Sequence, residues 1–164
     1  MNLRWYRGNI MFVLNFKGVF LWRDLHIMKY EIRYLSKLGN TKKIALAISE
    51  VVGVVAKDLS VEMPKNVDIL FLGCAVYGFD IDEQVKNFIN GLDDVKKVAI
   101  FSTSSISKCA FKRIVKLLEK KRIPYFKDNF YCKGEYKFLN KNKPNISEIE
   151  AAKLFAKRIM KEGI

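Results

Sequence analysis

The residues with the clearest capacity for chemistry lie in one short polar loop. It contains Ser36, Gly39, Asn40 and Thr41, and it joins a β-forming segment to a segment with helical spacing. Backbone N–H groups and the positive dipole end of a helix N-terminus attract anions. The hydroxyl and amide groups would add hydrogen-bond donors, and the glycine would let a ligand approach the backbone closely. The loop therefore predicts a phosphate site, and the alternative is an ordinary turn in which Thr41 only caps the helix.

Two further loops have similar positions, each after an apolar segment. Residues 72–80 include Tyr77 and Gly78, and residues 101–106 include several hydroxyl side chains. The first loop lacks the Gly-Lys-Ser/Thr ending of a nucleoside triphosphate site, which argues against ATP or GTP as the ligand. The three loops together form the candidate site.

The histidine and cysteine content excludes several other chemistries. His26 is the single histidine, and Cys74, Cys109 and Cys132 are scattered without a CxxC pair. A zinc site needs a different ligand set, and most histidine-dependent catalysis is also excluded. An odd, dispersed set of cysteines fits reduced thiols in the cytoplasm better than a disulfide framework.

The elements that would position these loops alternate along the chain. Apolar and β-branched runs predict strands over residues 29–34, 54–56, 67–73, 97–102 and 125–130. Apolar residues at helical spacing predict helices over residues 41–52, 81–92 and 107–121. A last helix is expected with Ser147 as its N-cap and Glu150 completing a capping box. This alternation predicts an α/β fold, a three-layer sandwich around a five-stranded, mostly parallel sheet. Ligands of such sheets bind beyond the carboxyl ends of the strands, where the three loops lie.

The positive charge of the chain is concentrated in one segment. The 164 residues, enough for one domain, have a formal net charge of +13, and residues 96–146 carry fourteen bases against three acids. Such an excess usually indicates nucleic acid, an anionic membrane or an acidic protein as partner. No nucleic-acid recognition motif accompanies the bases, so we expect no nucleic-acid partner. The segment predicts a docking face for an acidic partner, with a merely solvated surface as the alternative.

Residues 34–41 resemble the phosphate loop of the flavodoxin family, whose pattern is Ser/Thr-x-Ser/Thr-Gly-x-Thr. Ser36, Gly39 and Thr41 match this pattern, and Asn40 is common at its position there. Leu38 departs from the pattern because a hydroxyl residue is expected, so one side-chain donor is lost while the backbone N–H remains. The resemblance implies that the phosphate of FMN is held by six residues of this loop: Ser36, Lys37, Leu38, Gly39, Asn40 and Thr41.

The other two loops are similar to the flavin-binding loops of short-chain flavodoxins. In that family the residue matching Tyr77 packs on the isoalloxazine ring, and the glycine matching Gly78 can turn its peptide toward flavin N5. Ile106 falls near the place of a second stacking aromatic. Either Phe111, or Tyr131 and Phe138 from the basic segment, would compensate for it. The resemblance implies that these loops contribute seven cofactor-binding residues: Ala75, Val76, Tyr77, Gly78, Thr103, Ser104 and Ser105.

The resemblance covers residues 29 to about 162 and implies the strand order 2-1-3-4-5 with FMN as a non-covalent cofactor. The implied function is electron transfer without a catalytic residue, because the flavin does the chemistry. An FMN-dependent reductase of a small substrate and a binding module that has lost flavin are the alternatives. We expect a cytoplasmic monomer without a membrane partner, whose basic segment docks a redox protein with an acidic surface.

A narrower similarity connects the chain with the flavodoxin-like proteins of bacterial bilirubin reductase operons. It rests on two short runs, Cys132-Lys133-Gly134 and residues 136–139. For Cys132, as for Cys74, a buried thiol is expected rather than a redox centre, because no neighbouring cysteine offers a resolving partner.

Residues 1–27 lie outside the resemblance and form an N-terminal extension to a domain over residues 28–164. Their apolar runs are too short for a spanning helix, and they lack a small-residue cleavage site. The codons of residues 22–24 can contain GGAGG, four codons before Met28, which suits a ribosome-binding site. Our hypothesis is that translation starts at Met28, which leaves a domain with a net charge of +10. A membrane-surface anchor is the alternative.

Overall fold

The structure is a computed structural model of the chain. Nearer the N-terminus it describes the backbone of three short strands, β1 (Arg4–Arg7), β2 (Ile10–Leu14) and β3 (Phe20–Asp24). They form an antiparallel sheet of their own in the order β1-β2-β3, within the segment predicted as an extension. The structure also describes residues 27–77, 80–106 and 108–163 with their side chains, except that of Tyr77 only the backbone is described.

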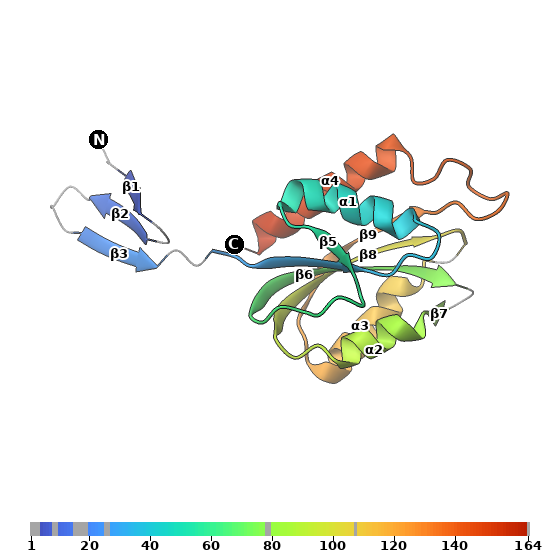
Figure 1. Ribbon diagram of the computed structural model, residues 1–164, viewed down its shortest axis with the longest axis horizontal. Helices are drawn as coiled ribbons and strands as arrows, with labels where there is room; N and C mark the ends of the chain where they lie inside the picture. The colour runs from blue at the N-terminus through green and yellow to red at the C-terminus, as the bar shows by residue number, and fades with distance from the viewer. Residues whose placement is uncertain are drawn as a thin grey trace.

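A central sheet of five parallel strands organises the rest of the chain (Figure 1). Its strands are β4 (Tyr30–Tyr34), β5 (Ala56–Asp58), β6 (Val67–Tyr77), β8 (Val95–Ser104) and β9 (Tyr125–Lys133). Their spatial order is β5-β4-β6-β8-β9, which confirms the predicted order 2-1-3-4-5. A short strand that the sequence pattern did not predict, β7 (Asp80–Ile81), pairs antiparallel with the end of β6.

Two helices cover each face of the sheet (Figure 1). Helices α1 (Asn40–Val52) and α4 (Ile146–Glu162) pack together on one face. Helices α2 (Glu83–Asn90) and α3 (Ala110–Lys121) pack on the other. The central strand β6 is apolar along most of its length because both of its faces are covered, as is typical of a parallel sheet. The fold is therefore the expected three-layer α/β sandwich.

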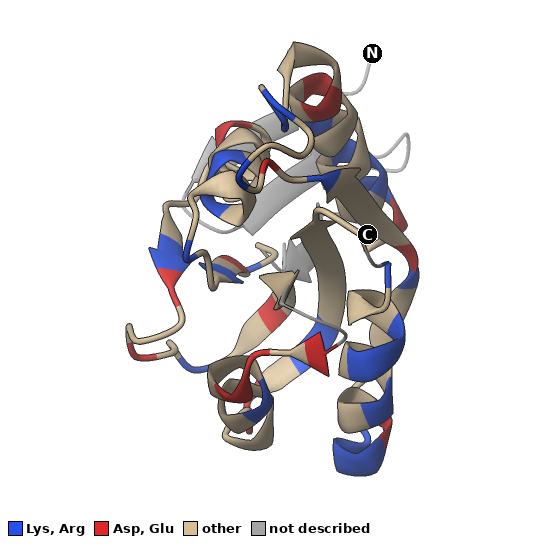
Figure 2. Cartoon of the chain, turned by 90° about the vertical axis from the view of Figure 1, so that its right-hand side faces the viewer, with Lys and Arg blue, Asp and Glu red and all other residues tan. Residues whose placement is uncertain are grey.

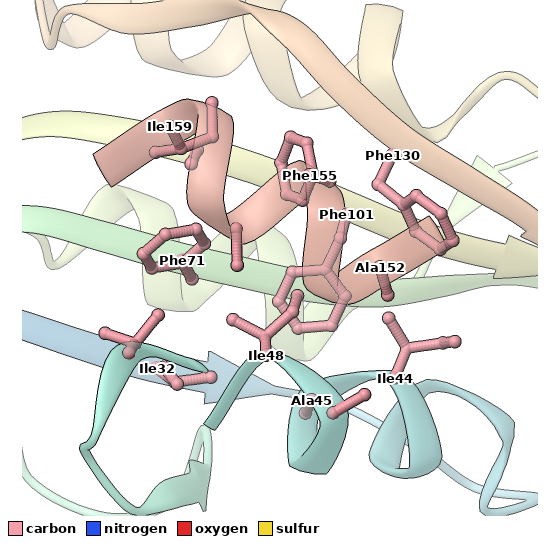
Figure 3. Packing of buried hydrophobic residues seen from close by; sticks show 14 of the residues in the cluster. Ile32, Ile44, Ala45, Ile48, Phe71, Phe101, Phe130, Ala152, Phe155 and Ile159 are labelled. Carbon is pink, nitrogen blue, oxygen red and sulfur yellow. The ribbon is translucent and has the colours of Figure 1, made fainter. Parts of the chain in front are cut away.

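The core beneath α1 and α4 is built from aromatic and aliphatic residues of both the sheet and the helices (Figure 3). The rings of Phe71 and Phe155 meet edge to face, with centroids 6.2 Å apart. Ile44 and Ile48, one turn apart on α1, are fully buried against them, which explains the helical spacing of the apolar residues in this segment.

Gly73 of β6 lets Phe101 of β8 enter this core. The two residues are paired neighbours in the sheet, and the Phe101 ring lies directly over the glycine. A Cβ atom at position 73 would lie 2.2 Å from two ring carbons of Phe101. In Figure 3 the ring projects from the sheet toward α1 and α4, so the missing side chain of Gly73 is replaced by an aromatic ring.

A buried ion pair lies on β4, on the opposite face of the sheet. Arg33 is fully buried and pairs with Glu31, two residues earlier on the same strand. The Arg33 guanidinium also donates to the carbonyl oxygens of Ile32 and Glu62, at 3.2 and 2.8 Å. Its Nε has no hydrogen-bond partner. The charge is thus held by one carboxylate and two carbonyls.

Several strands run further toward their carboxyl ends than the sequence pattern predicts. β6 reaches Tyr77, β8 reaches Ser104 and β9 reaches Lys133. In β8 the pattern stops earlier because hydroxyl residues follow the apolar run, yet Thr103 and Ser104 are buried and continue the ladder with β9. The hydroxyl residues of the third loop are therefore held by the sheet rather than by a free loop.

The cap of α4 differs from the prediction. The N-cap is Asn145, not Ser147, and the partner in the capping box is Glu148, not Glu150. Asn145 Oδ1 accepts from the Glu148 N–H at 3.3 Å, and Glu148 Oε2 accepts from the Asn145 N–H at 2.7 Å. Both pairs have the same spacing in the sequence, but the helix starts directly after the turn at Pro144, so the earlier pair forms the cap.

Two features are absent from the described residues. None of their helices has the length and apolar character needed to cross a membrane. The same residues contain no cluster of histidine, cysteine or acidic side chains that could hold a metal ion.

Candidate functional site

A pocket lies at the carboxyl ends of the central strands, where the three predicted loops meet. Its cavity volume is about 270 Å³, near the lower end of the range for small-molecule sites. Nine of the thirteen predicted site residues line it: Ser36, Leu38, Asn40, Thr41, Ala75, Val76, Thr103, Ser104 and Ser105. The structure adds three lining residues to them: Ile106, Gly134 and Tyr136.

The N-terminus of α1 opens at this pocket. Gly39 precedes the helix in the left-handed conformation, with φ of 80°, and no side chain caps the helix. The first backbone hydrogen bond of the helix runs from the Lys43 N–H to the Gly39 carbonyl, at 3.0 Å. The earlier N–H groups of the first turn have no partner within the helix, and the first turn carries no acidic residue. This arrangement suits an anion such as a phosphate.

Thr41 links the first loop to the third. It is fully buried inside the first turn of α1, so it does not cap the helix as the alternative interpretation held. Its Oγ1 lies 2.8 Å from the Oγ1 of Thr103 at the end of β8. Two hydroxyl groups from distant parts of the chain thus share one hydrogen bond at the wall of the pocket.

The basic segment that follows β9 closes the pocket from the side. The Asn40 amide donates to the Glu135 carbonyl at 2.8 Å, and the Gly134 N–H donates to the Ser104 carbonyl at 3.1 Å. A Cβ atom on Gly134 would lie 2.8 Å from Nδ2 of Asn40, so only glycine allows this close approach. The first and third loops are therefore fastened to the same short stretch of chain.

Two further hydrogen bonds fix this stretch. The Ser105 hydroxyl donates to the Gly134 carbonyl at 2.9 Å, and the Asn140 amide donates to the Ser105 carbonyl at 3.0 Å. Sequence reasoning missed Gly134 and Tyr136 as site residues, because their partners are distant in the chain. The available signal was a glycine directly after the fifth strand, in an otherwise basic and polar segment.

Among the described residues, two predicted site residues, Lys37 and Gly39, do not line the pocket. Gly39 contributes through its backbone, as described above. The Lys37 side chain instead reaches Asp82, with Nζ 2.5 Å from Oδ2, and this hydrogen bond lowers the pKa of the Asp82 carboxyl. Tyr77 ends β6, but its side chain lies outside the described residues, and so does Gly78. The predicted contacts of Tyr77 and Gly78 with a ring stay predictions.

The place expected for a second aromatic is occupied by Ile106, and Tyr136 lies in the same lining. None of the three aromatic residues named from the sequence lines the pocket. Phe138 is 87 % exposed, and Phe111 packs against Tyr125 instead. Tyr131 is half-buried, and its hydroxyl lies 3.3 Å from the Ser104 carbonyl.

Two of the three cysteines are buried thiols, as expected. Burial is the main cause that raises the pKa of Cys74 to about 12, and the same cause raises the pKa of Cys132 to about 12. A thiol with so high a pKa is almost entirely protonated at neutral pH and is a poor nucleophile. Cys109, before α3, is only half-buried.

We expect alkylation with iodoacetamide at pH 8 to label Cys109 at least about a hundred times faster than Cys74 or Cys132 in the folded protein. The reagent needs an accessible thiolate, which the two buried residues do not offer. Peptide mass spectrometry over a time course measures the three rates. In strong denaturant the rates should become similar. Rapid labelling of Cys132 in the folded protein would contradict the assignment.

A five-stranded parallel sheet in this order, with an uncapped helix N-terminus and three loops that meet at one edge, defines a flavodoxin-like α/β protein. Residues 31–148 match the family model of the flavodoxin domain. The chain therefore belongs to the flavodoxin family.

Known proteins similar to the chain include archaeal and bacterial relatives. A protein of unassigned function from Methanocaldococcus jannaschii is 29 % identical over 136 residues, which are 74 % of this chain and 91 % of that protein. A flavodoxin from the domain Archaea has a TM-score of 0.63 at 18 % identity, and the match covers 83 % of this chain and 99 % of that one. Flavodoxin 2 from Bacillus cereus has a TM-score of 0.63 at 18 % identity, and the match covers 82 % of this chain and 99 % of that one. A short-chain flavodoxin associated with a bacterial microcompartment has a TM-score of 0.65 at 13 % identity, and the match covers 84 % of this chain and 100 % of that one. The narrower similarity to proteins of bilirubin reductase operons finds no support in these comparisons.

Proposed function

We propose that this protein binds FMN non-covalently and carries electrons between other redox proteins. The observation that carries the proposal is the uncapped N-terminus of α1, which opens into a pocket made by three βα loops in a flavodoxin-family chain. A phosphate needs N–H and hydroxyl donors without nearby carboxylates, and the first turn of α1 offers this combination. The residues present thus fit the phosphate end of FMN.

Each loop has a separate task in this proposal. Ser36, Gly39, Asn40 and Thr41 hold the phosphate, while the buried bond from Thr41 to Thr103 keeps the first and third loops in register. Ala75 and Val76 line the pocket with apolar surface that excludes water. When bound, the flavin supplies the redox chemistry, and the chain positions it and shields it from solvent.

The remaining predicted residues complete the site. Tyr77 and Gly78 would contact the flavin ring, and the ends of β8 and its loop would line the far edge of the ring. No side chain in this proposal acts as an acid or a base. The residues of the far edge are Thr103, Ser104 and Ser105.

An absorption spectrum recorded during stepwise reduction tests this function. Purified protein, reconstituted with FMN if necessary, should show flavin bands at one equivalent per chain, and the titration should resolve one- or two-electron behaviour. Addition of NAD(P)H with a quinone separates the carrier from an FMN-dependent reductase, because a carrier turns over only through a separate reductase. Protein that retains no FMN even in excess would overturn the proposal in favour of a binding module without flavin.

The departure of Leu38 from the family pattern yields a prediction about affinity. The side chain is 54 % exposed, so a change to threonine costs little packing. A hydroxyl there should donate a hydrogen bond to the FMN phosphate, and a bond to a charged group contributes about 1.5 kcal/mol or more. We expect Leu38→Thr to lower the Kd for FMN about tenfold, measured by fluorescence quenching of the flavin.

Leu154→Thr is the matched control for this prediction. Leu154 is similarly exposed, at 56 %, but lies on α4 and does not line the pocket. Its substitution should leave FMN affinity unchanged. Equal affinity in both variants would mean that position 38 does not face the phosphate.

A further inference from the structure

We propose that the rim of the pocket docks an acidic redox protein through an apolar patch and the unpaired lysines of the segments that form it. This inference rests on the proposed function, because it names the partner of that same site. It goes beyond net charge, since the structure shows which bases are free and what lies between them.

The apolar part of the rim is exposed and held in place. Ile106 is 76 % exposed and Phe138 is 87 % exposed, although both are large hydrophobic residues. Phe138 lies in a tight turn closed by backbone hydrogen bonds of 3.1 and 2.9 Å between Tyr136 and Leu139. Because Tyr136 and Ile106 also line the pocket, the exposed apolar surface is continuous with its mouth. An exposed cluster of this kind at a binding site is typical of a protein contact.

Lysines without carboxylate partners lie in the two chain segments that form this patch. Among the described residues, Lys108, Lys133, Lys137 and Lys141 form no ion pair. Lys137 lies over the Tyr136 ring, 5.5 Å from its centroid, and Lys108 lies 5.2 Å from the centroid of Tyr131. These contacts place both ammonium groups beside the aromatic side chains at the end of the sheet that carries the pocket.

Some bases elsewhere in the described residues have a carboxylate partner, whereas others, such as Lys112 and Lys116 on α3, have none. The carboxylates of Asp80, Asp128 and Glu50 pair with Lys86, Arg158 and Lys153 respectively. Figure 2, which faces the pocket end of the molecule, shows Lys and Arg concentrated on α3 at the lower right and acidic residues at α2 on the lower left. The pocket end of the molecule therefore carries the bases of α3 as well as the unpaired rim lysines.

The chemistry of this rim favours an acidic protein over nucleic acid or a second copy. A patch with an apolar centre and a charged border has the composition of a transient protein interface. The free bases are lysines, which attract an acidic surface from a distance but give no paired hydrogen bonds to a phosphate backbone. A second copy would bring lysine against lysine. With FMN bound, the docked partner would supply one electron to the flavin, so that the partner would be oxidised as the flavin is reduced.

The test compares two doubly substituted proteins that carry the same change in net charge. Lys133→Glu with Lys137→Glu reverses two bases at the rim. Lys157→Glu with Lys161→Glu reverses two exposed bases on the far half of α4, which also form no ion pair among the described residues. The probe is a plant-type [2Fe–2S] ferredoxin, a small acidic one-electron carrier. Its Kd is measured by calorimetry at low and at physiological salt, with and without FMN.

We expect the rim variant to bind ferredoxin at least about tenfold more weakly than the parent at low salt, and the α4 variant to stay within about twofold. Stopped-flow reduction of FMN-loaded protein by reduced ferredoxin should slow in the same order. Equal weakening in both variants would overturn the proposal, because net charge alone would then explain binding. Binding of oligo(dT) in place of ferredoxin would also overturn it. A third outcome is that the protein cannot hold FMN but still binds ferredoxin through the rim. That outcome would support the docking face and refute the proposed function.

Discussion

Replacement of Gly73 by alanine should destabilise the protein by about 3 kcal/mol. The new methyl group would lie 2.2 Å from two ring carbons of Phe101, a distance that a Cβ atom does not adopt. Phe101 is fully buried and cannot swing into solvent, so the ring or strand β6 must move. Overpacking of this kind usually costs about 1–3 kcal/mol, and a contact this short on the central strand belongs at the upper end. Urea unfolding measures the loss of free energy.

The effect should extend to the pocket, because the Gly73 carbonyl accepts from the Leu35 N–H at 2.9 Å at the start of the first loop. We therefore expect FMN affinity to fall along with stability. Gly91→Ala is the matched control, since its nearest neighbours would be carbonyl oxygens at 3.6 Å and its φ of −86° suits any residue. Phe101→Leu combined with Gly73→Ala should restore part of the lost stability. If Gly73→Ala costs no more than Gly91→Ala, the ring does not occupy this place.

The second large effect concerns the buried arginine of β4. Arg33→Met should reduce the free energy of unfolding by about 3 kcal/mol, because it leaves the buried carboxylate of Glu31 without its main partner. Lys57, which is partly exposed and lies 3.8 Å from Glu31, compensates only in part. Chemical unfolding at pH 7 is the measurement.

A surface pair in the same protein provides the comparison. Arg158 contacts Asp128 through two nitrogens, at 2.8 and 3.4 Å, but more than half of its side chain is exposed. Arg158→Met should cost less than about 1 kcal/mol because water replaces the lost contact. The double variant Glu31→Gln with Arg33→Met should recover stability relative to Arg33→Met alone. Equal costs for the two arginines would show that Arg33 is not desolvated in solution.

Local patterns in the sequence predict the fold well, for a physical reason. Strands such as β6 are apolar because they are covered on both faces, and α1 repeats its apolar residues every turn because one side packs on the sheet. Strands and helices alternate along the chain, and connections between parallel strands are right-handed, so few sheet topologies are possible. The two-residue strand β7 escapes prediction because its pairing depends on the end of β6 rather than on its own composition.

The site is predictable only where its contacts are local. Ser36, Gly39 and Thr41 lie in one turn, and their spacing alone indicates an anion site. The closing residues Gly134 and Tyr136 owe their position to hydrogen bonds with segments far away in the chain, which no local pattern encodes. The same holds for Lys37, whose side chain is drawn to Asp82, 45 residues further along.

The long-range hydrogen bonds that close the pocket also determine when it can form during synthesis. The Asn40–Glu135 hydrogen bond spans 95 residues, and the Thr41–Thr103 bond spans 62. During synthesis the loop before α1 leaves the ribosome early, whereas Thr103 follows with β8 and Glu135 emerges only after β9 has been made. Because the first loop alone lacks walls, a nascent chain cannot retain a ligand there until the last strand joins the sheet. Ligand capture is therefore one of the final events in the maturation of this domain.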